Sequence, residues 1–213
     1  VLKNLFENDY INEKDYKEFV EQKITLKKRK KTFREDTSYY VEDIRKNVID
    51  QLGYDKVYKQ GLNISTPIDL DLQKIAIKAL RDGLISYDKR KGWRGALLKE
   101  QKLDSWKDKI EEFKLEKSIN WDLAIIKKVE KFFVEIETEN QQIGVIKYEN
   151  ITWIKKEFDE ILKVGDVVYV EKIKDDKFSL RQLPLVNGGI VVMDPFTGRV
   201  MALSGGFSFK KSE

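Results

Sequence analysis

The spacing of hydrophobic residues changes once along this sequence, and that change limits the folds open to it. Between Leu72 and Leu84 apolar side chains recur at intervals of three and four positions, as they do along one face of a helix. After Trp121 the apolar residues alternate with polar ones, as from Phe132 to Glu137, or form short runs between turns. We therefore predict an α+β chain in which helical segments precede a sheet.

Polar and glycine residues mark the ends of the first predicted helices. Asn12 is expected to cap a helix within the first 31 residues, with Asp15 as its reciprocal partner. Another helix is expected to begin near Thr37 and to end at Gly53, because glycine readily adopts the left-handed conformation that follows a helix.

The next helix lies inside the stretch from Gly61 to Gly95. Asp69 is its preferred N-cap, because the carboxylate can accept hydrogen bonds from the free N–H groups of the first turn. Thr66, followed by Pro67, offers a competing start three residues earlier.

Other local structure is predicted on either side of that helix. A short strand is expected at residues 61–65, and it is predicted to pair with a hairpin at residues 188–203. The charged block from Tyr87 to Gly95 reads as a loop, and the apolar spacing from residue 95 to 118 predicts another short helix.

The second half of the chain contains about five short strands separated by turn signals, which is typical of a small barrel. We predict a five-stranded OB-like barrel. The hairpin that follows turns at Pro195 and Gly198, and both of its arms are continuously apolar. Both faces of this partial antiparallel sheet are therefore expected to be covered in the intact protein.

Composition excludes several classes of protein. The chain has no cysteine and no histidine, which removes disulfides, thiolate chemistry, a Ser–His–Asp triad and His-ligated metals. The 41 basic and 37 acidic residues nearly cancel, so the net charge of +4 describes a mixed surface and not a nucleic-acid footprint. No window approaches 18 consecutive apolar residues, so no membrane span is predicted.

Several short motifs resemble catalytic sites, but each lacks a necessary part. Two S-x-x-K matches occur, at Ser86–Lys89 and Ser208–Lys211, but chance matches are expected in a chain this rich in lysine, and no S-x-N or K-T-G follows either. The adjacent carboxylates Glu111–Glu112 and Asp175–Asp176 lack a partner carboxylate opposite them. The paired glycines lack the lysine and spacing of a phosphate-binding loop. We expect no catalytic, cofactor-binding or metal-binding residue in this chain.

Two features could indicate nucleic-acid binding. The four tryptophans, at positions 93, 106, 121 and 153, could form a stacking platform on an OB barrel, although aromatic residues near strand starts are more often core or interface. The basic run Lys27–Lys31 could contact nucleic acid or an anionic membrane, but a solvated linker is the simpler interpretation.

The stretch from Gly61 to Gly95 resembles the region joining the two catalytic domains of class A (bifunctional) penicillin-binding proteins of the 1A type. There T-T-I-D leads into a helix carrying L-Q, and a Y-D-R-R-x-G-x-R-G block follows. The matching residues are Thr66, Ile68, Asp69, Leu72, Gln73, Tyr87, Asp88, Arg90, Gly92, Arg94 and Gly95. Pro67 and Lys89 depart from the pattern.

Two further segments carry the same resemblance. Residues 162–170 are similar to the last strands of the family's inserted OB-like domain. Residues 188–206 resemble the hairpin that opens the transpeptidase sheet. In the family this hairpin is followed by S-x-F-N-R-A-x-x-A and then by the catalytic serine, which places the nucleophile beyond residue 213.

The resemblance implies a domain organisation. The expected parts are a helical exit from the glycosyltransferase domain at 1–35, linker elements belonging to the transpeptidase half at 36–92, an OB-like inserted domain at 93–186 and the first transpeptidase hairpin at 187–213. The chain is thus expected to be an internal, soluble, non-catalytic piece.

The resemblance also implies a function. The parent would be a peptidoglycan glycosyltransferase and serine-type DD-transpeptidase of cell-wall assembly and cell shape, anchored in the bacterial inner membrane and facing the periplasm. The expected partners are the missing glycosyltransferase and transpeptidase domains and an envelope regulator on the OB-like domain, with no cofactor and no nucleic acid. The alternatives are an OB-fold module that binds single-stranded nucleic acid and an independent hydrolase with a carboxylate pair.

Overall fold

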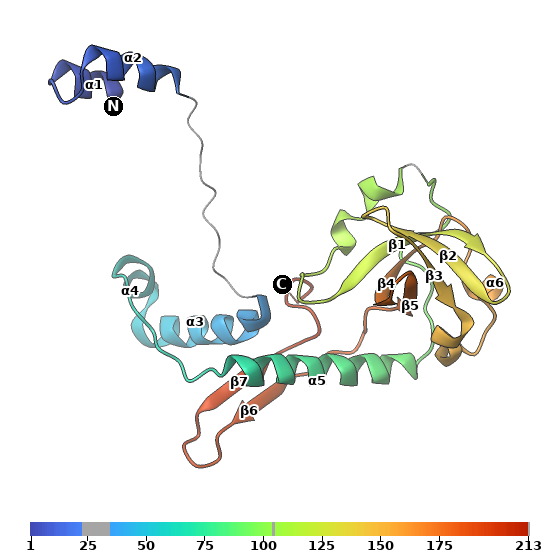
Figure 1. Ribbon diagram of the computed structural model, residues 1–213. Helices are drawn as coiled ribbons and strands as arrows, with labels where there is room; N and C mark the ends of the chain where they lie inside the picture. The colour runs from blue at the N-terminus through green and yellow to red at the C-terminus, as the bar shows by residue number, and fades with distance from the viewer. Residues whose placement is uncertain (23–34, 104, 213) are drawn as a thin grey trace. The chain divides into compact units, whose positions relative to one another are not determined.

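The computed structural model describes residues 1–22, 35–103 and 105–212, and it divides the chain into two compact units, residues 1–33 and 34–213 (Figure 1). In the first unit, helices α1 (Leu2–Glu7) and α2 (Glu13–Glu21) pack through the stacked rings of Phe6 and Tyr16, whose centroids lie 5.0 Å apart. Asn12 caps α2 as predicted: its Oδ1 accepts from the Asp15 N–H at 2.8 Å. The basic run Lys27–Lys31 lies outside the described residues.

Three α-helices open the second unit, after a 3₁₀ turn (η1, Glu35–Thr37): α3 (Ser38–Leu52), α4 (Tyr54–Lys59) and α5 (Leu70–Lys89). The predicted end of α3 is confirmed, since Gly53 has φ +83°. Asp69 is the N-cap of α5, where its Oδ1 accepts from the Asp71 and Leu72 N–H groups. The competing start at Thr66 is therefore wrong.

Two predictions around α5 are also wrong. Residues 61–65 form no strand, and Leu62 and Ile64 are both exposed, so this segment has no buried face to pair. The backbone bond that reaches the hairpin comes instead from the Asp69 N–H to the Met201 carbonyl, at 2.9 Å. The helix itself continues to Lys89, so the charged block from Tyr87 is helical at its start.

Five strands form a closed barrel, which confirms the OB-like prediction: β1 (Trp121–Val129), β2 (Phe133–Thr138), β3 (Ile143–Lys147), β4 (Val167–Lys174) and β5 (Lys177–Arg181). Their order is β1-β2-β3-β5-β4, and only the β3–β5 pairing is parallel. Two 3₁₀ turns, η4 (Tyr148–Asn150) and η5 (Thr152–Ile154), and helix α6 (Phe158–Ile161) lie between β3 and β4.

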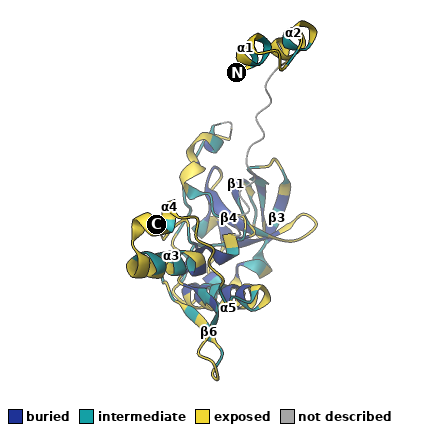
Figure 2. Cartoon of the chain, turned by 90° about the vertical axis from the view of Figure 1, so that its left-hand side faces the viewer, coloured by how far each residue is buried: buried dark blue, intermediate teal, exposed yellow. Residues whose placement is uncertain are grey.

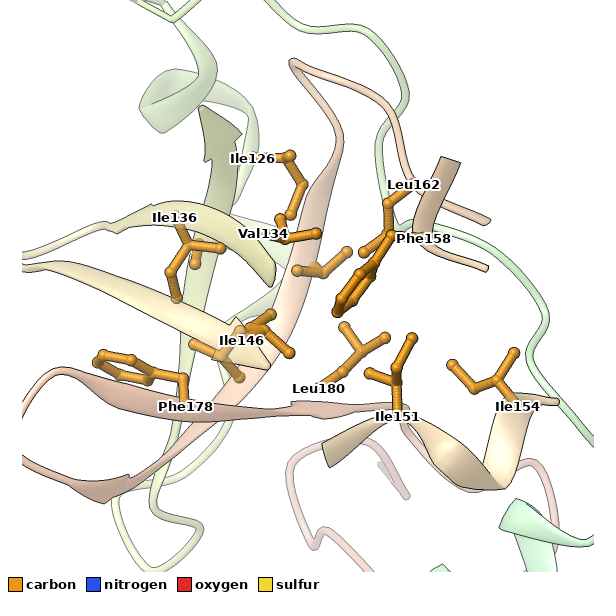
Figure 3. Close-up of a cluster of buried hydrophobic side chains, with 13 residues drawn as sticks. Ile126, Val134, Ile136, Ile146, Ile151, Ile154, Phe158, Leu162, Phe178 and Leu180 are labelled. Carbon is orange, nitrogen blue, oxygen red and sulfur yellow. The ribbon is translucent and has the colours of Figure 1, made fainter. Parts of the chain in front are cut away.

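The interior of the barrel is filled by branched aliphatic residues and two phenylalanines (Figure 3). Ile136 and Ile146 come from the strands, and Phe158 on α6 closes the core. Gly144 is required here because a Cβ on it would lie 2.3 Å from the ring of Phe178. The alternation seen in β2 follows directly, since Val134 and Ile136 point inward whereas Phe133, Glu135 and Glu137 point outward.

A second apolar core lies on the outside of the barrel. The segment we call the arm (residues 97–103 and 105–120) packs Trp106 and Ile110 against strands β1 and β4. The Tyr169 hydroxyl on β4 donates to the carbonyl of Phe113 in the arm, and burial raises the pKa of this tyrosine. The arm is not the predicted α-helix; it contains two 3₁₀ turns, η2 (Trp106–Lys109) and η3 (Glu111–Phe113).

Strands β6 (Ile190–Met193) and β7 (Val200–Ser204) form the predicted hairpin, which lies beside α5 (Figure 1). Gln73 joins the two: its side chain is fully buried, donates to the Leu203 carbonyl at 2.9 Å and accepts from the Leu203 N–H at 2.9 Å. The amide thus replaces the backbone of a neighbouring strand. Val191 and Met193 on β6 are exposed, so coverage of that face stays a prediction. Exposed residues are visible along the β6–β7 hairpin in Figure 2.

Helices long and apolar enough to cross a bilayer do not occur in the part of the chain that the structure describes.

Candidate functional site: the junction between helix α5 and the barrel

Helix α5 contacts the barrel and the hairpin through two clusters of buried charge. Arg81 and Asp88 are seven residues apart, so they lie two turns apart along one face of the helix. We call their surroundings the Arg81 cluster and the Asp88 cluster. Both residues are held by partners that lie before or after the barrel strands in the sequence.

The Asp88 cluster ties the two ends of the barrel to the end of α5. Arg94, which precedes the barrel, donates from both terminal nitrogens to the two Asp88 oxygens, at 2.9 and 3.0 Å. Gln182 and the Leu185 N–H, which follow β5, donate to the same carboxylate at 2.8 and 3.2 Å. Such a forked arginine–carboxylate pair fixes orientation as well as distance.

The charge of Asp88 is maintained in spite of its burial. The side chain is 4% exposed, and burial by itself would raise its pKa. The hydrogen bonds from Arg94 and Gln182 outweigh that effect and hold the pKa of Asp88 below its ordinary value. The carboxylate is therefore ionised throughout the neutral range.

The Arg81 cluster joins α5 to the arm. Arg81 donates to the carbonyl of Ser118 at 2.8 Å and to the carboxylate of Glu116 at 3.3 Å. It also donates to the carbonyl of Phe207, which follows β7, at 2.9 Å. Both charged side chains are mostly buried, 16% exposed for Arg81 and 11% for Glu116. Burial lowers the pKa of Arg81 and Glu116 opposes that shift.

The segment after β7 completes this cluster, and we call residues 205–212 the exit segment. It passes close to Tyr39 of α3: a Cβ on Gly206 would lie 2.4 Å from the Tyr39 hydroxyl oxygen, and one on Gly205 would lie 3.0 Å from the ring. This glycine pair therefore allows close packing against Tyr39. Tyr39 in turn donates to the Ser208 carbonyl at 3.1 Å.

The S-x-x-K matches do not assemble a nucleophile and its lysine. Ser208 is buried, and its hydroxyl donates to Glu116. The Nζ of Lys211 donates to the carbonyl of Glu112. At the other match, Lys89 places its Nζ 5.7 Å from the ring of Trp153, and burial lowers the pKa of that lysine.

The tryptophans contribute to packing. Trp106 of the arm is fully buried against β1 and β4, and Trp121 packs against Phe207 with ring centroids 5.1 Å apart. Trp93 and Trp153 meet edge to face at 6.3 Å, and the Trp93 indole donates to the Ile161 carbonyl at 3.3 Å. These positions agree with the core or interface interpretation and not with a stacking platform.

The carboxylate pairs occupy turns. Glu111 bonds to Lys114 at 2.8 Å on the surface of the arm. Asp175 has φ +50° in the turn between β4 and β5, where the carbonyl of Asp176 accepts from the Val145 N–H. The expectation that the chain lacks catalytic, cofactor and metal residues stays a prediction.

Sequence reasoning found Asp88 and Arg94 only as members of a motif and missed Arg81 and Glu116. A signal for the first pair was present, because Asp88 continues the apolar stripe four residues after Leu84. A polar residue on an apolar helix face needs a buried partner. Nothing local marks Glu116, which lies 35 residues from Arg81 in the sequence.

A cavity of about 420 Å³ lies at the junction. Ile77, Ile85 and Trp121 supply its apolar wall. The basic side chains that line it all have acidic partners, as Arg81 has in Glu116. The cavity is therefore a seam between packed elements that offers no free positive charge to an anionic ligand.

The barrel region and the whole chain are each similar to known proteins. The sequence profile of the penicillin-binding protein OB-like domain matches residues 93–186. Over its whole length the chain is 35% identical to penicillin-binding protein 1A of Rickettsia bellii and 26% identical to that of Pseudomonas aeruginosa. It covers 27% of each of these relatives.

A solved structure has a similar fold. The crystal structure of penicillin-binding protein 1A from Haemophilus influenzae matches 99% of this chain with a TM-score of 0.73 and 25% identity, and 32% of that chain is covered. The chain belongs to the penicillin-binding proteins of the 1A type. It spans about a quarter of the length of the curated relatives it matches.

Proposed function

We propose that this chain is the inter-domain region of a bifunctional peptidoglycan synthase, and that its own task is to set the geometry between the parts of that enzyme. The parent would polymerise glycan strands with a glycosyltransferase domain and cross-link stem peptides with a penicillin-sensitive serine DD-transpeptidase domain. The observation that carries the proposal is the junction, where two buried charge clusters hold the barrel and the hairpin on one helix.

Buried charge suits such a task because of its directionality. Apolar contacts are non-directional, so an apolar seam tolerates sliding. A buried ion pair adds little net stability, yet it is costly to break, because each charge would be left without its partner. The forked Arg94–Asp88 pair and the Arg81–Glu116 pair are therefore satisfied in one relative orientation only.

Catalysis in this proposal belongs to the missing domains, and the proposed partners of this chain are those domains. We expect no acyl adduct when this chain alone is incubated with a fluorescent penicillin. A labelled band that disappears in Ser208→Ala would contradict this. In this proposal the parent lies on the periplasmic side of the bacterial inner membrane and takes part in cell-wall assembly and the determination of cell shape.

A specific observation supports a second role, the docking of an envelope regulator on the barrel. The outside of β1 and β4 is covered by the arm, whereas the outside of β2 and β3 is open. Ile143, at the start of β3, is 60% exposed on that open face, and Phe132, in the turn that leads into β2, is 70% exposed. Binding energy at protein interfaces comes disproportionately from large apolar anchors of this kind.

The nucleic-acid alternative is less well supported. The outward residues of β2 include Glu135 and Glu137, whose negative charge repels phosphate. Salt-dependent retention of a labelled oligonucleotide by the purified chain would favour this alternative, and no retention at low salt would remove it.

The experiment that tests the geometric role uses the full-length protein. Arg94→Met removes the fork while keeping an apolar stem, and Lys78→Ala, which removes an exposed ion pair with Asp82, serves as the matched control. We expect Arg94→Met to lower the number of cross-links per glycan strand while glycan polymerisation continues at its normal rate. Equal cross-linking in both variants and the wild type would contradict the proposal.

A further inference from the structure

The exit segment is held from two sides. On one side Tyr39 of α3 packs edge-on against Phe209, with ring centroids 5.0 Å apart. On the other side lies the arm. Lys210 and Lys211 donate from their side chains to the arm carbonyls of Lys114 and Glu112.

Glu116 makes the central contacts of this second side. Its Oε1 accepts from the Phe209 N–H at 3.1 Å and from Arg81 at 3.3 Å, and its Oε2 accepts from the Ser208 hydroxyl. An ionised carboxylate has about four acceptor positions, so one side chain can join several segments. Glu116 thus links helix α5, the arm and the chain that leaves β7.

The arm is packed tightly on the barrel. Trp106 and Ile110 of the arm are buried against β1 and β4, and the Leu97 N–H and the Val167 carbonyl form a backbone bond at 2.8 Å. Glu116 stands five residues before the first barrel strand. A shift of the barrel along α5 therefore displaces the Glu116 carboxylate from the exit segment.

We propose that Glu116 is the positioning residue through which the barrel restrains the exit segment, so that a change in barrel orientation is transmitted to the chain that leaves the β6–β7 hairpin. This deepens the proposed geometric function and rests on it for the consequence of a barrel shift. It also gives the buried Ser208 a role as a donor to Glu116.

The exit segment can separate from the arm while its contacts with Tyr39 remain in place. Arg81 keeps its hydrogen bond to the Phe207 carbonyl when the arm withdraws, whereas its bonds to Glu116 and Ser118 of the arm are lost together. The exit segment keeps its bonds to Tyr39 through the Ser208 carbonyl and the Ser212 hydroxyl. Release breaks the hydrogen bonds between the exit segment and the arm, and the restraint is therefore a local one.

The test is hydrogen exchange of the full-length protein, read by mass spectrometry on peptides covering residues 205–212. Glu116→Gln keeps the size of the side chain but removes its charge, and Glu112→Gln is the matched control, since only its backbone carbonyl is used. We expect exchange in the exit segment to rise about tenfold in Glu116→Gln, because a hydrogen bond to a charged acceptor contributes roughly that factor or more. The control should behave as wild type.

A second variant tests transmission from a distance. Asp88→Asn loosens the barrel at the other cluster without touching the exit segment, and we expect it to raise exchange at 205–212 by a smaller factor. Unchanged exchange in Glu116→Gln would overturn the restraint, and unchanged exchange in Asp88→Asn would overturn the transmission. Peptides from β2 should keep wild-type exchange in both, which excludes general unfolding.

Activity measured on the same preparations separates this inference from the proposed function. Faster exchange with an unchanged ratio of cross-linking to polymerisation would support the restraint and contradict the geometric function. A changed ratio with unchanged exchange would support the geometric function and overturn the restraint.

Discussion

The interior of the barrel and the junction on α5 are both buried, yet they are held by opposite chemistry. Inside the barrel, Ile126, Ile136, Phe178 and their neighbours exclude water with apolar atoms (Figure 3). At the junction, Arg81 and Asp88 bring full charges out of water and satisfy them with hydrogen bonds. Burial therefore has two uses in this chain, stability in the barrel and orientation at the junction.

The two regions also differ in the residues they join. The barrel core comes from one continuous part of the sequence, so the barrel can exclude water with its own residues. The junction joins α5 to segments up to 126 residues away, as in the bond from Arg81 to Phe207. Substitutions inside the barrel should therefore mainly lower its stability, whereas substitutions at the junction should mainly disturb the orientation of the segments joined there.

The largest effect is expected inside the barrel. Phe178→Ala empties a fully buried aromatic site, and we expect it to lower the free energy of unfolding by about 3–5 kcal/mol. Phe132→Ala is the matched control, because its ring is 70% exposed, and it should change stability by less than about 0.5 kcal/mol. Urea unfolding followed by tryptophan fluorescence measures both. Similar destabilisation in the two variants would mean that the core is not where the stability lies.

A smaller effect is expected at the junction. In Asp88→Asn an amide NH₂ replaces one carboxylate oxygen and faces the donors of Arg94 and Gln182. We therefore expect this substitution to lower the free energy of unfolding by about 2 kcal/mol. The strands of the barrel should keep their hydrogen-exchange protection, in contrast to Phe178→Ala. If Asp88→Asn exposed the barrel core as much as Phe178→Ala does, the distinction between stability and orientation would fail.

Acid should weaken the junction before it weakens the barrel interior. The folded pKa of Asp88 is held below its unfolded value, so its contribution is present in full above about pH 4 and is lost as pH falls through the folded pKa. Asp88→Asn has no such group to titrate. The stability difference between wild type and Asp88→Asn, measured from about pH 6 to about pH 2, should therefore shrink in acid. A constant difference would show that Asp88 has the same pKa in the folded and the unfolded protein, and it would contradict the lowered folded pKa.

The features predicted correctly from the sequence are those that depend on residues close together in the chain. Asn12 and Asp69 were identified as caps because a cap depends on residues two or three positions away. The barrel was predicted because its strands alternate and its turns follow at short intervals. The family was predicted because Tyr87, Asp88, Arg94 and other residues occur in a fixed order.

Sequence reasoning failed where the deciding contact is distant. Residues 61–65 look like a strand, yet Gln73 makes the strand-like bonds to Leu203 from a helix. The apolar stripe alone ends helix α5 too early, because Asp88 is a buried polar residue that continues the same face. Glu116 was missed altogether, since its partners Arg81 and Ser208 are 35 and 92 residues away.

The smallest predicted effect asks whether α5 matters only through its two charged residues. Gly83 lies between Arg81 and Asp88 in the helix, and a Cβ added to it would meet nothing within 4 Å. Gly83→Ala should therefore raise the free energy of unfolding by about 0.5–1 kcal/mol, because alanine loses less conformational freedom in a helix. Exchange at residues 205–212 and the cross-linking ratio should stay at wild-type values. If Gly83→Ala changed the exchange at residues 205–212 or the cross-linking ratio, the orientation of the barrel would depend on the whole of α5 and not on Arg81 and Asp88 alone.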